Sequence, residues 1–92
     1  ALKVNIFEHL SVIDYGDLPV TPGYFYESHA QITEGASKIL DANVTPIFLG
    51  GDHSISWALL RAVAKKFGPV ALVHFDSHSD LWSGYFGGKD TH

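Results

Sequence analysis

Three short apolar runs, separated by two longer stretches with a helical repeat, constrain the fold of this chain most strongly. The runs cover residues 10–13, 45–49 and 70–75 and are rich in valine, isoleucine, leucine and phenylalanine. Such runs are typical of buried strands. Strands that alternate with helices form a parallel sheet with right-handed crossovers. The order strand, helix, strand, helix, strand therefore predicts an α/β fold with a parallel sheet covered by helices.

The helical stretches are expected at residues 25–43 and 54–67. In the first, apolar side chains recur on one face, although Gly35 in its middle costs about 1 kcal/mol relative to alanine. In the second, most positions are apolar, and Gly68-Pro69 provides a stop. A strand at 70–75 that is apolar on both faces needs neighbours on both sides. Residues 1–92 are therefore expected to form a single, incomplete part of a larger α/β domain.

Potential metal ligands follow two of the predicted strands. Asp76, His78 and Asp80 occupy alternate positions after the third run, and alternate residues of an extended backbone point to the same side. Two carboxylates and an imidazole in one small volume favour a bound cation. His53 follows the second run, and the carboxyl ends of parallel strands share one edge of a sheet. Solvated loop carboxylates, and a helix cap formed by Asp52, are the structural alternatives.

The other histidines have weaker signals. His92 is either a proton-transfer group near the metal or an exposed terminal histidine. His74 shares strand parity with Asp76, and we expect a buried, hydrogen-bonded core histidine, with support of the metal ligands as the lesser option. His9 and His29 are expected to be structural or exposed at the surface.

Composition narrows the chemistry and the partners. The chain has 92 residues, a formal net charge of −4 and no cysteine, so any metal must be held by nitrogen and oxygen atoms. A carboxylate-rich set favours Mn²⁺, and two such ions lower the pKa of a shared water. The acidic balance speaks against nucleic acid, and no apolar run approaches the roughly 20 residues that span a bilayer. We expect a cytoplasmic protein, with an organellar location left open, and a small cationic substrate.

The motifs Gly-Gly-Asp-His-Ser at 50–54 and Asp-Ser-His-Ser-Asp at 76–80 together resemble the ureohydrolase family of arginases, agmatinases and related amidinohydrolases. The loop at 82–92 is most similar to the agmatinase and guanidinobutyrase branch. The resemblance implies a three-layer α/β/α sandwich that assembles into trimers or hexamers. It also implies hydrolysis of a guanidino compound, such as agmatine, to urea and an amine by attack of a metal-bridging hydroxide.

The same resemblance assigns roles to individual residues. His53 and Asp80 would bind one manganese ion, His78 would bind the other, and Asp76 would bridge the two. His92 falls where the family carries a histidine that shuttles protons near the substrate, so Asp76 and His92 are the implied catalytic residues.

One family feature has no counterpart in residues 1–92, namely the third metal motif, an Asp-x-Asp. We therefore expect a central fragment of a ureohydrolase that is unstable and inactive as an isolated chain. Two other interpretations stay open: another amidino or formimino hydrolase of the same family, and a non-catalytic metal-binding fragment. A deacetylase of related fold fits less well, because its metal motifs differ.

Overall fold

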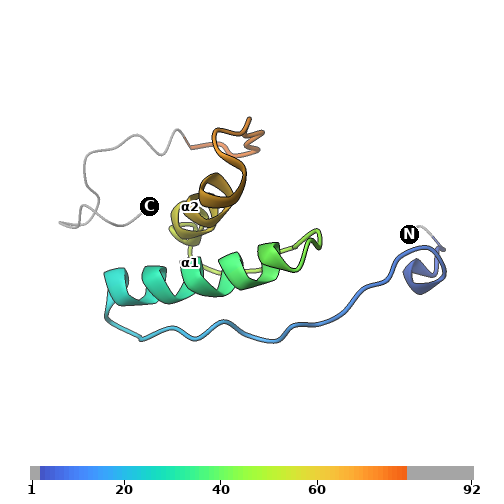
Figure 1. Cartoon of the computed structure of the whole chain (residues 1–92), viewed down its shortest axis with the longest axis horizontal. Helices are drawn as coiled ribbons and strands as arrows, with labels where there is room; N and C mark the ends of the chain where they lie inside the picture. The colour runs from blue at the N-terminus through green and yellow to red at the C-terminus, as the bar shows by residue number, and fades with distance from the viewer. Residues whose placement is uncertain (1–2, 79–92) are drawn as a thin grey trace.

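The computed structural model describes residues 3–78, and its two long helices form a crossed pair. A short 3₁₀ helix, η1 (Ile6–Glu8), precedes α1 (Phe25–Asp41) and α2 (Ile55–Phe67). In Figure 1, α2 crosses one side of α1, and the chain that leads into α1 runs along the other side. Both predicted helices are thus confirmed, and their positions agree with the expected ranges to within two residues at each end.

α1 begins and ends at residues suited to those positions. Before it, the Ser28 hydroxyl accepts a hydrogen bond from the Thr21 backbone N–H at 3.0 Å and donates to the Thr21 carbonyl at 2.9 Å, which closes the entry turn. After it, Asn43 adopts a left-handed backbone with φ of 57°. Asparagine tolerates that conformation better than most residues, so the helix stops here.

The contact between the helices is made largely of small residues. Ala36 and Leu40 of α1 are buried against Ala62 of α2, while Phe48 and Val63 pack around them. Alanine at the crossing allows the two backbones to approach closely. Burial of so few large side chains stabilises the pair only modestly.

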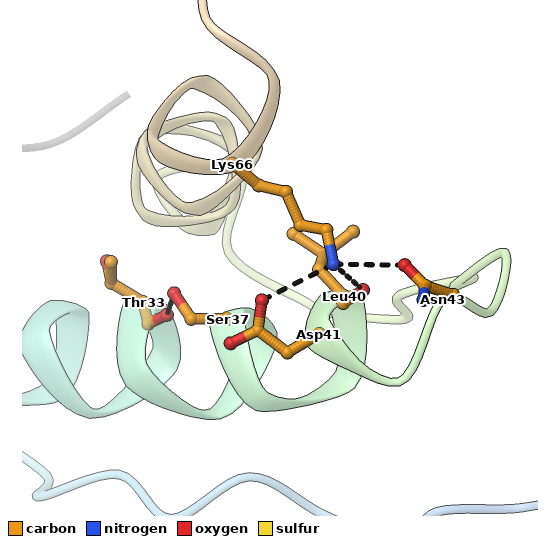
Figure 2. A network of polar contacts seen from close by, with 6 residues as sticks. All are labelled: Thr33, Ser37, Leu40, Asp41, Asn43 and Lys66. Atoms are coloured by element: carbon orange, nitrogen blue, oxygen red, sulfur yellow. Dashed lines mark hydrogen bonds and ion pairs between the residues drawn. The ribbon is translucent and has the colours of Figure 1, made fainter.

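A lysine of α2 closes the carboxyl end of α1. Lys66 Nζ donates to the Leu40 carbonyl at 2.6 Å and lies 3.3 Å from carboxylate and amide oxygens of Asp41 and Asn43 (Figure 2). The last carbonyls of a helix lack intrahelical donors, and a cation near them is favourable. Lys66 therefore joins the two helices at the end opposite to the turn that leads into α2.

The entry segment lies against α1 at Gly35. A Cβ atom at that position would lie 2.5 Å from Leu18 Cδ2, so the missing side chain makes room for Leu18. The segment that carries Leu18 passes along α1 in Figure 1. Gly35 is unfavourable for the helix alone, but its lack of a side chain allows Leu18 to pack against α1.

The three predicted strands are not formed within residues 3–78, so the described part of the chain does not confirm the expected sheet. Residues 10–13, 45–49 and 70–75 have no strand pairing in the described part of the chain. Most of their large side chains are exposed, with Ile47, Leu49 and Phe75 at 86%, 93% and 95%, whereas Phe48 packs against the helices. A strand forms only when a neighbour satisfies its backbone donors and acceptors. These segments therefore carry the composition of buried strands without the neighbours that would pair with them.

No helix among the described residues is long and apolar enough to cross a bilayer.

Candidate metal centre

The turn that precedes α2 presents His53. Asp52 Oδ1 accepts the Ser54 backbone N–H at 2.8 Å, which fixes a local turn before the helix. The N-cap of α2 is Ser54, and no side chain makes a capping hydrogen bond there, so the expected cap by Asp52 is not formed. The Ile55 side chain of α2 lies over Gly50, where a Cβ atom would meet Ile55 Cδ1, so glycine leaves room for this side chain. His53 is half-buried at this turn, and its Nδ1 lies 3.5 Å from the Ser56 hydroxyl.

Asp76 has histidine neighbours at both carboxylate oxygens. Oδ1 accepts the backbone N–H of His78 at 2.8 Å and lies 2.7 Å from the Nδ1 atom of the same residue. Oδ2 lies 3.6 Å from Nε2 of His74. These interactions, the backbone N–H of His78 foremost and its imidazole next, hold the pKa of Asp76 below its ordinary value. The carboxylate is therefore anionic at neutral pH, as a metal ligand must be.

Three potential ligands from the two turns converge. One donor atom each from His53, His74 and Asp76 lies within 4.8 Å of the others. The His53 and His74 rings stack with centroids 5.2 Å apart and an interplanar angle of 11°. Three ligands that each lie about 2.1 Å from one ion are evenly separated by at most about 3.6 Å. A contraction of up to about 1 Å would let these atoms share one divalent cation.

The donor set also fits the expected metal chemically. It consists of imidazole nitrogens and a carboxylate, and the whole sequence contains no cysteine. Such a set suits Mn²⁺, Fe²⁺, Co²⁺ or Zn²⁺ rather than metals that require thiolate. The residues therefore fit a first-row divalent cation.

The structure brings together some of the predicted site residues. His53 and Asp76 meet although 23 positions separate them, and His78 joins the group through Asp76. Asp80 and His92 lie outside the described residues. Whether these residues bind metal stays a prediction.

Two further histidines lie at or next to the candidate ligands. His74 was expected to be buried, but its side chain is 41% exposed because no sheet covers it, and it groups with the candidate ligands instead. The sequence indicated this position because His74 and Asp76 are two residues apart and would lie on the same side of an extended segment. His29 is 4% exposed and contacts the Ser54 carbonyl next to His53. Only its position on the apolar face of α1 pointed to burial.

Comparison with known protein families decides the relationship. All 92 residues match the model of the arginase family. The chain belongs to the arginase family. The resemblance found in the two ligand-bearing motifs is thereby confirmed.

The curated relatives of this arginase-family chain carry enzyme names. It is 40% identical over 92% of its length to an agmatinase of Bacillus cereus, and covers 29% of that protein. It is 42% identical over 94% of its length to a mitochondrial guanidino acid hydrolase of Homo sapiens, and covers 24% of it. A guanidinobutyrase of Pseudomonas aeruginosa is 40% identical over 94% of the chain, which covers 27% of that protein.

The chain thus spans 24–29% of the length of these three relatives. The predicted similarity to the agmatinase and guanidinobutyrase branch is confirmed by their names. No solved structure matches the chain significantly. Membership of the arginase family implies an α/β fold, of which residues 3–78 show helices and no strand pairing.

Proposed function

We propose that the full-length protein is a manganese-dependent ureohydrolase that cleaves a guanidino compound to urea and an amine. The observation that carries this proposal is the convergence of His53 with the anionic Asp76 at two neighbouring turns. The names of the relatives support it, because agmatinases and guanidinobutyrases act on the guanidino compounds after which they are named.

The residues of this chain would hold and orient the reacting groups. His53 and Asp80 would hold one manganese ion, His78 would hold the other, and Asp76 would contribute to the binding of both. A pair of divalent cations supplies Lewis acidity and a water of lowered pKa. His78 steers the Asp76 carboxylate through its backbone N–H and its ring, and His92 transfers a proton near the substrate.

A cationic guanidino group suits an acidic site. The guanidinium is resonance-stabilised, so its carbon resists attack by neutral water. The formal net charge of −4 is compatible with attraction of such a cation, although the charge acts over the whole surface. We propose agmatine as the first substrate, with 4-guanidinobutyrate as the second candidate because of the guanidinobutyrase relative.

The rest of the domain is also part of the proposal. Residues 10–13, 45–49 and 70–75 would be strands of a three-layer α/β/α sandwich once their exposed apolar side chains gain neighbours. An Asp-x-Asp elsewhere in the protein would supply the remaining ligands, and the subunits would form trimers or hexamers. We keep the cytoplasm as the proposed compartment, while the human and chicken relatives are named as mitochondrial.

The test combines metal content with urea release. Native mass spectrometry of the full-length protein in Mn²⁺ should show two metal ions per chain. Urea release should be measured with agmatine, 4-guanidinobutyrate, 3-guanidinopropionate and arginine. Asp76→Asn should lower both the metal content and the activity, whereas Glu34→Gln, on the exposed face of α1, should change neither. Full metal content and activity in Asp76→Asn, or no urea from any of these compounds, would contradict the proposal.

A further inference from the structure

Two side chains of α1 donate to backbone carbonyls at the start of α2. The His29 ring places Nε2 3.0 Å from the Ser54 carbonyl oxygen. One turn further along, the Thr33 hydroxyl lies 3.0 Å from the Ala58 carbonyl oxygen and 2.8 Å from the His29 carbonyl oxygen, and these two acceptors share its single hydrogen. The donors are four residues apart, and so are the acceptors. The two bonds therefore hold the helices in a single register.

The His29 bond requires a hydrogen on Nε2, because a carbonyl oxygen only accepts. The other ring nitrogen, Nδ1, lies 2.8 Å from the Phe25 carbonyl of the same helix. The ring also stacks on Phe25, with centroids 3.9 Å apart, and is 4% exposed. A neutral imidazole carries a single N–H, so with the hydrogen on Nε2 the Phe25 carbonyl receives no bond from Nδ1. The ring is then held by its stacking on Phe25 and by the Nε2–H that faces Ser54, the residue before α2.

The carbonyl that His29 holds belongs to the residue next to His53. Ser54 is the N-cap of α2, and its carbonyl also accepts the Trp57 backbone N–H at 3.1 Å. The Asp52 carboxylate fixes the same turn from the other side of His53. Movement of the Ser54 peptide would displace His53, whose ring must meet Asp76 across the gap between two turns.

We propose that His29 is a positioning residue for the metal centre: its Nε2–H holds the Ser54 carbonyl and thereby fixes the turn that presents His53. This inference rests on the proposed metal function of His53. Partners that orient metal ligands commonly change metal affinity by about 10–100-fold when they are removed. Since His29 acts through the backbone, the effect should lie near the lower value.

Replacement of His29 by glutamine or by asparagine tests the roles of its two ring nitrogens separately. The glutamine amide reaches about as far as Nε2, so His29→Gln keeps a donor for the Ser54 carbonyl. The asparagine amide reaches about as far as Nδ1, so His29→Asn keeps a donor only near the Phe25 carbonyl. Thr33→Val removes the other bond between the helices, one turn away from the ligand turn, and is the matched control for general loosening.

The readout is the dissociation constant of Mn²⁺ for the full-length protein, measured by calorimetry. We expect His29→Asn to weaken binding about tenfold, while His29→Gln and Thr33→Val stay within about threefold of the wild type. A merely structural role predicts that His29→Asn and Thr33→Val lower the melting temperature but bind Mn²⁺ as the wild type does. Wild-type affinity in His29→Asn, or equal weakening in Thr33→Val, would overturn the proposal.

Hydrogen exchange of the amides at residues 55–57 distinguishes this proposal from the metal assignment. His29→Asn should accelerate their exchange, including that of the Trp57 N–H, and His29→Gln should not. If the wild type bound no Mn²⁺, the assignment of the metal centre would be wrong. The proposed effect of His29 on metal affinity would then be wrong too. The exchange data would still show whether His29 fixes the turn. Unchanged exchange in His29→Asn would refute that part as well.

Discussion

Replacement of Lys66 by methionine would remove the ammonium group that closes the carboxyl end of α1 and keep most of the side-chain stem. In the wild type, Nζ donates to the Leu40 carbonyl at 2.6 Å and to Asp41 and Asn43 oxygens at 3.3 Å (Figure 2). The Lys66 side chain is 22% exposed, whereas that of Asp41 is 75% exposed. The bond to the Leu40 carbonyl therefore contributes most of the stabilisation.

The magnitude follows from these contacts. A hydrogen bond with a charged donor contributes about 1.5–3 kcal/mol, and an exposed ion pair about 0–1 kcal/mol. The Leu40 carbonyl keeps a bond from the Asn43 backbone N–H at 3.0 Å, so it is not left unpaired. We expect Lys66→Met to lower the free energy of opening of the last turn of α1 by about 1–2 kcal/mol. That loss corresponds to amide exchange roughly 5–30 times faster.

Hydrogen exchange with mass spectrometry on the full-length protein measures this effect locally, in peptides that cover residues 37–43. Lys65→Met is the matched control, because Lys65 is the adjacent lysine of α2 and is exposed. It loses the same charge without the contact to α1 that Figure 2 shows for Lys66. Equal exchange rates in the two variants would refute the assignment of Lys66 as the cap.

Three further predictions concern turns, packing and charge. Gly68 ends α2 with φ of 75° and ψ of −156°, so Gly68→Ala should lower the free energy of unfolding by about 1–3 kcal/mol; an unchanged melting temperature would contradict this. Gly35→Ala should gain the full helix benefit of about 1 kcal/mol only in a Leu18→Ala background, and equal gains in both backgrounds in urea denaturation would count against the Leu18 contact. The hydrogen bond from Lys38, and then its charge, lower the pKa of Glu34. The contribution of this pair is therefore present above the unfolded-state pKa of Glu34 and is lost as pH falls through the folded-state value. The stability difference between the wild type and Glu34→Gln should shrink from pH 7 to about pH 3, and a difference independent of pH would argue against the pair.

The helices were predictable because a helix is a local structure. Each backbone bond in α1 and α2 joins residues four apart, and the apolar face repeats with the same period. The residues that end the helices also act locally. As expected, α2 ends at Gly68, and Asn43 follows the end of α1. The strands were not confirmed in the described residues because their bonds need partners distant in sequence, which composition alone does not supply.

The candidate metal centre was also predictable only in part. The sequence by itself determined which ligand types stand at the turns after 45–49 and 70–75, and at what spacing. Only the tertiary structure decided that His74 joins His53 and Asp76, that His29 reaches the carbonyl of Ser54, and that Lys66 caps the other helix. The contacts with His53, His29 and Lys66 join residues separated by 21 to 26 positions. Those of His29 and Lys66 depend on how α1 and α2 cross, whereas the His53 group depends on how the chain returns after α2. Helical periodicity selects the apolar face of each helix, but the crossing and its register arise from side-chain packing and from donors that meet carbonyls of another element.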